Sequence, residues 1–139
     1  MEKLPLRLED YLETIYILLK EKGNARVTDI AKIRNVKKST ITEALKQLSI
    51  KGFINYKPYS SITLTEKGKN YAENIIKKHK ILEEFYKKVL QEENREDELC
   101  NLEHFLSNET LKRIEALTKF FEEKNLNKEF GEFLKKWLK

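Results

Sequence analysis

The feature that most constrains this fold is a pair of short amphipathic segments between residues 27 and 52. The first reads VTDIAKIRN and the second KKSTITEALKQLSIKG, and in both the apolar residues recur at helical spacing. Thr28 and Ser39 are predicted N-caps, and Gly52 is a predicted stop for the second helix. Two short helices with a tight connection predict a helix-turn-helix.

The residues that follow are not helical in pattern. Residues 53–56 and 61–64 are short β-prone runs, and the intervening KPYS supplies a turn. The pattern predicts a β-hairpin. A hairpin directly after a helix-turn-helix predicts a wing, so the first fold element is a winged helix.

Charge is distributed unevenly along the chain. Residues 1–70 hold 14 Lys and Arg against 8 Asp and Glu, whereas residues 71–139 hold 14 against 15. The hydrophobic fraction of 40% excludes a disordered chain. We therefore expect residues 1–70 to form a basic domain that meets a polyanion, and residues 71–139 to form a second domain.

Short hydroxyl side chains and lysines lie where the second helix of the pair would present them outward. Small hydroxyls and long cations can reach base edges, and lysines beside them can contact phosphates. A solvated basic face is the alternative interpretation. The predicted contacts to double-stranded DNA are Lys37, Lys38, Ser39, Thr40, Thr42, Lys46 and Lys57.

The second half of the chain is predicted to be entirely helical. A long helix opens near Thr65, an acidic connection covers residues 91–98, and further helices cover about 99–106 and begin at Asn108. A last helix at 129–139 carries an aromatic stripe that must be covered by its own subunit or a partner. We expect it to pack on the second domain, giving a mainly α protein.

Potential metal ligands occur at helical spacing in three places. Cys100, Glu103 and His104 stand at i, i+3 and i+4, His79 precedes Glu83 by four residues, and Asp10 precedes Glu13 by three. Thiolate, imidazole and carboxylate are ligand types for a divalent metal. Core packing of the cysteine and histidines, and solvation of the acids, are the alternatives. Local spacing does not show whether these faces converge.

Four segments, taken in order, carry a resemblance to a known family. They are LEDYLETIYILLKEKGNARVTDIA, the helix-turn-helix with a wing ending in LTEKGK, KKHKILEEFY, and CNLEHFLS. Over about residues 4–122 the chain resembles the diphtheria toxin repressor and manganese transport regulator (DtxR/MntR) family of metal-activated transcriptional repressors. The resemblance implies an N-terminal winged helix-turn-helix, an all-helical dimerisation and metal-binding domain, homodimers, and metal sites where the first helix meets the second domain.

The same resemblance implies a ligand set. The matching positions are Asp10, Glu13, His79, Cys100, Glu103 and His104, with Glu83 at an ancillary position of iron-responsive members. Iron-responsive members generally have methionine in place of Asp10, and manganese-responsive members generally have glutamate in place of Cys100. A soft thiolate beside hard carboxylates favours Fe²⁺, with Mn²⁺ as the alternative.

The expected function is metal-activated repression at inverted-repeat operators of metal-uptake genes, in a protein without a third, SH3-like domain. The rival interpretation is a metal-independent winged-helix regulator that senses an organic ligand. An enzyme is disfavoured because no oxyanion loop or glycine-rich phosphate cradle is present. One cysteine, no signal-peptide pattern and no long apolar stretch predict a cytoplasmic protein that does not enter the membrane.

Overall fold

The computed structural model describes residues 3–139 and divides them into two compact units, one up to Ile75 and one from Ile76 to Lys139. Each unit is described here by itself. In the described residues the fold is mainly helical with a single two-stranded hairpin, as the sequence predicted. No helix among residues 3–139 combines the length and the apolarity that crossing a membrane requires.

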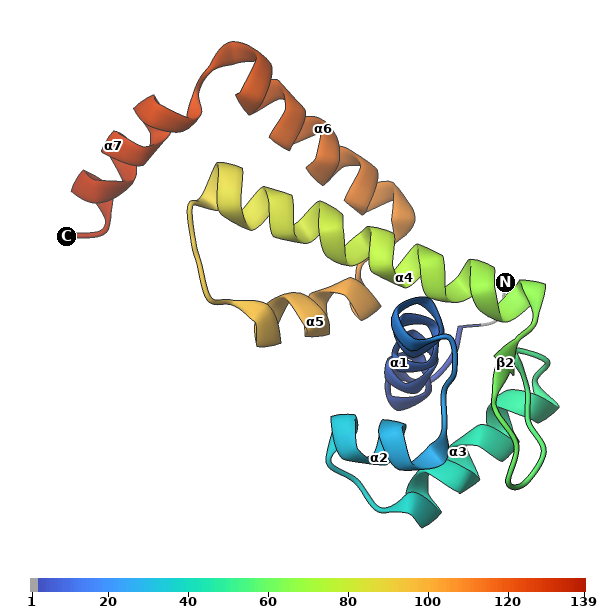
Figure 1. Ribbon diagram of the computed structural model, residues 1–139. Coiled ribbons are helices and arrows are strands. Elements are labelled where there is room, and N and C mark those ends of the chain that lie inside the picture. Colours follow the sequence, from blue (N-terminus) through green and yellow to red (C-terminus); the bar gives the residue numbers. More distant parts are fainter. Residues whose placement is uncertain (1–2) are drawn as a thin grey trace. The chain divides into compact units, whose positions relative to one another are not determined.

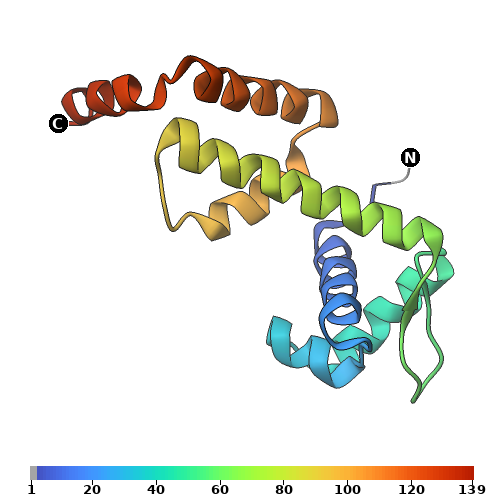
Figure 2. The same cartoon turned by 45° about the horizontal axis from the view of Figure 1, so that its top comes forward.

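The N-terminal unit is a winged helix-turn-helix (Figure 1). Its helices are α1 (Leu6–Lys22), α2 (Val27–Arg34) and α3 (Lys38–Ile50), followed by β1 (Ile54–Asn55), β2 (Thr63–Leu64) and the start of α4 (Glu66–Phe85). The strands are antiparallel, with Ile54 opposite Leu64 and Asn55 opposite Thr63. In Figure 2 the hairpin projects as a narrow loop beside α3, which is the form expected of a wing.

Both predicted N-caps were wrong by two residues. Helix α2 begins after Arg26 and α3 after Lys37, so Thr28 and Ser39 lie inside the first turns rather than at the caps. The side chains of Arg26 and Lys37 make no capping hydrogen bond to the backbone amides of the first turn. Extended backbone at Arg26 and Lys37 starts these helices without the hydroxyl cap that the residue types suggested.

One apolar core holds the N-terminal unit together. The side chains of Leu12, Leu45 and Phe53 are completely buried and come from α1, α3 and the residue before β1. The start of α4 packs closely on this core, because a Cβ added at Gly68 would lie 1.9 Å from the Phe53 carbonyl oxygen. Thr65 caps α4 by accepting a hydrogen bond of 3.0 Å from the Gly68 amide.

The second unit continues α4 and adds a π-helical turn, η1 (Tyr86–Leu90), then α5 (Glu96–Phe105), α6 (Asn108–Lys124) and α7 (Asn127–Trp137). In both views α5 and α6 lie on different sides of α4 (Figures 1 and 2). The buried apolar cluster is small, consisting of Leu82, Tyr86, Leu99 and Leu111. Helix α5 starts three residues earlier than predicted, which places Glu96 on the helix rather than in the acidic connection.

Helix α7 packs on its own unit at its beginning. Phe130 meets Phe121 of α6 edge-on at 5.7 Å between ring centroids, and Gln91 donates a 2.6 Å hydrogen bond to the Asn127 carbonyl. Leu134 is half-buried, but other residues of the predicted stripe are exposed, at 55% for Phe133 and 73% for Trp137. The expected packing of the last helix is therefore only partial.

Candidate metal centre and DNA-binding surface

The predicted DNA-contacting side chains lie on one end of α3 and on the hairpin. Lys37 precedes α3, and Lys38, Ser39 and Thr40 form its exposed first turn. Thr42 is half-buried and donates a 3.0 Å hydrogen bond to the Lys38 carbonyl, while Lys46 and Lys57 are exposed. The N-terminus of α3 thus offers cations and hydroxyls to solvent.

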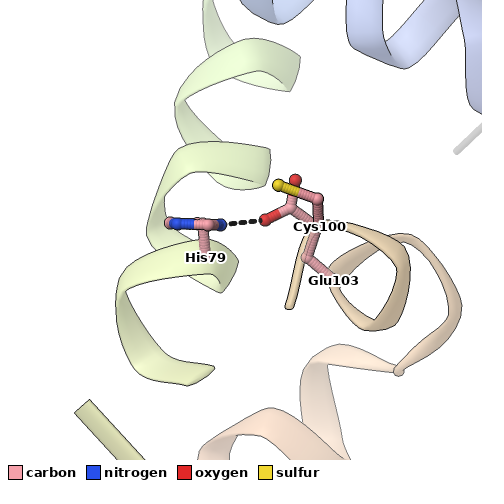
Figure 3. Close-up of side chains that lie close together, drawn as sticks. All are labelled: His79, Cys100 and Glu103. Carbon is pink, nitrogen blue, oxygen red and sulfur yellow. Dashed lines mark hydrogen bonds and ion pairs between the residues drawn. The ribbon is translucent and has the colours of Figure 1, made fainter. Parts of the chain in front are cut away.

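Three of the predicted metal ligands meet in the second unit. His79 lies on α4, and Cys100 and Glu103 lie on α5, yet one potential ligand atom from each falls within 4.8 Å of the others. The imidazole Nδ1 of His79 is 2.7 Å from Oε2 of Glu103 (Figure 3). Nitrogen, sulfur and oxygen donors at this spacing are a donor set for a transition metal.

Glu103 has one carboxylate oxygen bonded to His79 and one that is unsatisfied. Its side chain is 1% exposed, and its Oε1 has no hydrogen-bond partner among the described residues. Nε2 of His104 is 3.6 Å from this Oε1, beyond hydrogen-bond range. A buried, unsatisfied carboxylate oxygen is costly, and a cation bound beside Cys100 and His79 would satisfy it. The residues present therefore fit a metal.

Carboxylates surround His79 on both ring nitrogens. The hydrogen bond that the His79 ring donates to Glu103, together with the charges of Glu103, Glu96 and Glu83, raises the pKa of His79 to about 9, against the lowering effect of burial. Without a metal, the imidazole therefore holds its proton at neutral pH. A metal ion can bind a ring nitrogen only after that proton has left, so proton and metal compete for His79.

A second group of ligand type shares His79. Its Nε2 lies 3.0 Å from Oε1 of Glu96 and 3.5 Å from Oε2 of Glu83, and the three side chains form a cluster within 4.8 Å. Glu83 and Glu96 are both exposed. The sequence interpretation missed Glu96, although its position four residues before Cys100 is the same helical spacing that drew attention to Glu83.

His104 and the α1 carboxylates are not members of these tight clusters. His104 is buried on α5 next to Glu103. Asp10 and Glu13 are half-buried in the N-terminal unit, where Arg34 of α2 donates a 2.8 Å hydrogen bond to the Asp10 carbonyl and lies 3.9 Å from the Glu13 carboxylate. A role for these three residues as ligands stays a prediction.

Comparison with known proteins identifies the family of this chain. Residues 3–62 match the iron dependent repressor, N-terminal DNA binding domain, and residues 65–129 match the iron dependent repressor, metal binding and dimerisation domain. A transcriptional regulator of the helix-turn-helix type from Methanocaldococcus jannaschii is 42% identical over 120 residues, covering 84% of this chain and 96% of that protein. The chain belongs to the DtxR/MntR family.

Other relatives agree with this membership. The regulator MntR of Geobacillus thermodenitrificans is 38% identical over 117 residues, which cover 84% of this chain and 83% of MntR. A manganese-dependent transcriptional repressor in complex with manganese matches with a TM-score of 0.74 and 27% identity over 81% of this chain, and the repressor ScaR with bound Zn²⁺ matches with a TM-score of 0.69 and 26% identity over the same share. The chain spans about half of these two solved chains, 53% and 54% of their length.

Membership in the DtxR/MntR family fixes the broad class of function. The family consists of metal-dependent transcriptional repressors, not enzymes, and its second domain binds a divalent metal and dimerises. The predictions of a DNA-binding regulator, a divalent metal cofactor and a homodimer are confirmed at this level.

Proposed function

We propose that this protein is a ferrous-iron-activated repressor, with Mn²⁺ as the alternative activator, that binds inverted-repeat operators of metal-uptake genes as a cytoplasmic homodimer. The observation that supports it best is the meeting of His79, Cys100 and the unsatisfied carboxylate of Glu103 in a chain that also carries a winged helix. A bound divalent cation would replace the proton of His79 and give the unsatisfied oxygen of Glu103 a partner.

The donor chemistry supports Fe²⁺ over Mn²⁺. Cys100 offers a soft thiolate, which suits iron, cobalt, nickel or zinc better than manganese. Carboxylates such as Glu103 are hard donors that Fe²⁺ and Mn²⁺ both accept. Zn²⁺ would bind more tightly than either in a test tube by the general affinity order, so metal supply in the cell selects the activator.

We further propose that Asp10, Glu13, Glu83 and His104 take part in the metal response, as the family resemblance implies. Metal then promotes repression by tightening operator binding. By linkage, the operator-bound protein binds metal more tightly by the same factor. In the exposed first turn of α3, Ser39 and Thr40 are proposed to reach base edges, with Lys37 and Lys38 on phosphates.

The test is anaerobic DNA binding at fixed salt, with Fe²⁺, Mn²⁺, Zn²⁺ or a chelator. The probe is a 30-base-pair duplex enriched from a random pool by the wild-type protein in the presence of metal. Fixed salt is essential because phosphate contacts alone change affinity by orders of magnitude. Wild type is compared with Cys100→Ala, Glu103→Gln and Asp10→Ala, with Cys100→Ser as the conservative variant.

We expect a metal to raise affinity for the selected duplex, and Cys100→Ala and Glu103→Gln to abolish the gain without altering metal-free binding. Loss of the gain in Asp10→Ala would assign the α1 carboxylate to the metal response. Equal binding with metals and chelator would contradict the proposal and favour a regulator that senses an organic ligand.

A further inference from the structure

Arg34, the last residue of α2, connects the helix-turn-helix to α1 inside the N-terminal unit. Its Nε donates a 2.7 Å hydrogen bond to the Thr14 hydroxyl, and its Nη2 donates one of 2.8 Å to the Asp10 carbonyl. The planar guanidinium thus grips α1 with two donors of fixed geometry. Lys32, the other basic residue in the last turn of α2, is exposed. Arg34 is therefore a fixed connection between two helices, not a solvated surface cation.

The α1 side of this connection is buried. Thr14 is 4% exposed, and its hydroxyl also donates a 2.9 Å hydrogen bond to the Asp10 carbonyl. The hydroxyl both donates and accepts, so moving Arg34 away would cost a hydrogen bond at a buried group. The position of the guanidinium is thereby fixed beside residues 10–14, the turn of α1 that carries the carboxylates of the proposed metal response.

The same guanidinium faces one of those carboxylates. Nη2 of Arg34 lies 3.9 Å from Oε1 of Glu13, whose side chain is 16% exposed. The distance is too long for a hydrogen bond, so the attraction is mainly coulombic. A divalent cation bound to Glu13 would lie close to the positive charge of Arg34, and the two cations would repel each other. Arg34 and a metal ion therefore compete for the Glu13 carboxylate.

We propose that Arg34 is a positioning residue that couples metal binding to the helix-turn-helix. Its ion pair with Glu13 lowers the affinity for metal, and a cation that takes Glu13 weakens the connection between α1 and the end of α2. The inference rests on the proposed function, in which Glu13 takes part in the metal response. It assigns the communication between metal and the DNA-binding helices to a side chain that is neither a predicted metal ligand nor a predicted DNA contact.

The first measurement is Mn²⁺ affinity of the full chain without DNA, by electron paramagnetic resonance of the free ion. The variants are Arg34→Gln, Glu13→Gln and the double substitution, which together form a double-mutant cycle. Lys32→Gln is the matched control, since it removes an exposed cation from the same turn of α2. Thermal melting without metal verifies that each variant folds.

We expect Arg34→Gln to tighten Mn²⁺ binding by about three- to tenfold, because the competing cation beside Glu13 is gone. In the Glu13→Gln background the same substitution should change Mn²⁺ affinity by less than about twofold, because the contested carboxylate is absent. Lys32→Gln should bind Mn²⁺ as wild type. A role of Arg34 in helix packing alone would lower the melting temperature but would not produce this dependence on Glu13.

The second measurement is the ratio of affinities for the selected 30-base-pair duplex with and without metal, at fixed salt, using Mn²⁺ and, anaerobically, Fe²⁺. This ratio is the coupling between metal and DNA, and it should fall by about threefold or more in Arg34→Gln. Arg34→Lys keeps the positive charge but cannot make both hydrogen bonds to α1, so it should lower the ratio while leaving Mn²⁺ affinity near that of wild type. This variant also decides the question if Arg34→Gln impairs folding.

The outcomes separate this inference from the proposed function. If metal strengthens operator binding by wild type, but the Arg34 variants match Lys32→Gln in Mn²⁺ affinity and in the ratio, Arg34 only packs, and the inference fails while the repressor function stands. If Arg34→Gln changes Mn²⁺ affinity equally with and without Glu13, the competition is wrong. If neither metal alters operator binding by wild type, the proposed function fails and the inference with it.

Discussion

The N-terminal unit encloses its apolar side chains in one core that reaches from α1 through α3 to the hairpin, whereas the second unit buries only a small apolar cluster and places Glu103 and His104 beside it. Both units also expose large apolar side chains, such as Ile50 in the first and Phe133 and Trp137 in the second. Burial of apolar surface is the main source of folding free energy. We therefore expect the N-terminal unit to be stabilised mainly by its own packing, and the second unit to gain more stability from what binds it.

The largest expected effect is the loss of a core side chain in the N-terminal unit. Leu45 of α3 is completely buried, so Leu45→Ala should lower the free energy of unfolding by about 2–5 kcal/mol through lost burial and the cavity left behind. Urea unfolding followed by circular dichroism measures it. A loss below about 1 kcal/mol would mean that this core collapses around the cavity or is less continuous than described.

Metal binding should stabilise the second unit. At a free Mn²⁺ concentration one hundred times its dissociation constant, amide hydrogen exchange in α5 should slow by the equivalent of about 2.7 kcal/mol. Cys100→Ala should remove this protection, and protein concentration is held fixed because the dimer contributes to stability. Equal protection of α2 and α3 would show that the units unfold together and would break the comparison.

A matched pair of glycine substitutions, one in each unit, sharpens the comparison of packing in the two units. In Gly68→Ala the new Cβ would meet the Phe53 carbonyl at 1.9 Å, so we expect a loss of about 1–3 kcal/mol. In Gly131→Ala the nearest atom is Oε1 of the exposed Gln91 side chain, at 2.5 Å, so this side chain must shift and its hydrogen bond to the Asn127 carbonyl weakens. The gain in helix propensity, up to about 1 kcal/mol, offsets that loss, so we expect a small net change in stability. Thermal melting of both variants decides, and similar losses in the two would contradict the difference in packing.

The helix caps provide the smallest test. Thr65 accepts a hydrogen bond from the Gly68 amide at the start of α4, and Ser107 accepts one of 3.1 Å from the Thr110 amide at the start of α6. Thr65→Ala and Ser107→Ala should each cost about 1 kcal/mol. Local exchange of α4 and α6 amides measures the effect. No change in α6 would mean that its first turn is already frayed in the wild type.

The winged helix could be predicted because helical period, a turn and two β-prone runs are all local signals. The start of α5 could not, since a run of acidic residues is compatible with both a loop and a first helical turn, where acids favour the helix dipole. That single error hid Glu96. The meeting of His79 with Cys100 and Glu103 depends on the packing of α4 against α5, which spacing within either helix does not encode.

Because Cys100 is the only cysteine of the chain, every thiol or thiolate signal from this protein has one origin. With Co²⁺ as a spectroscopic substitute, a charge-transfer band from thiolate to metal would report the cluster of His79, Cys100 and Glu103 and no other place. Because there is one thiol, its rate of reaction with a thiol reagent reports metal occupancy, since a metal-bound thiolate reacts more slowly. A regulator with one thiol therefore contains its own optical readout, and needs no engineered label.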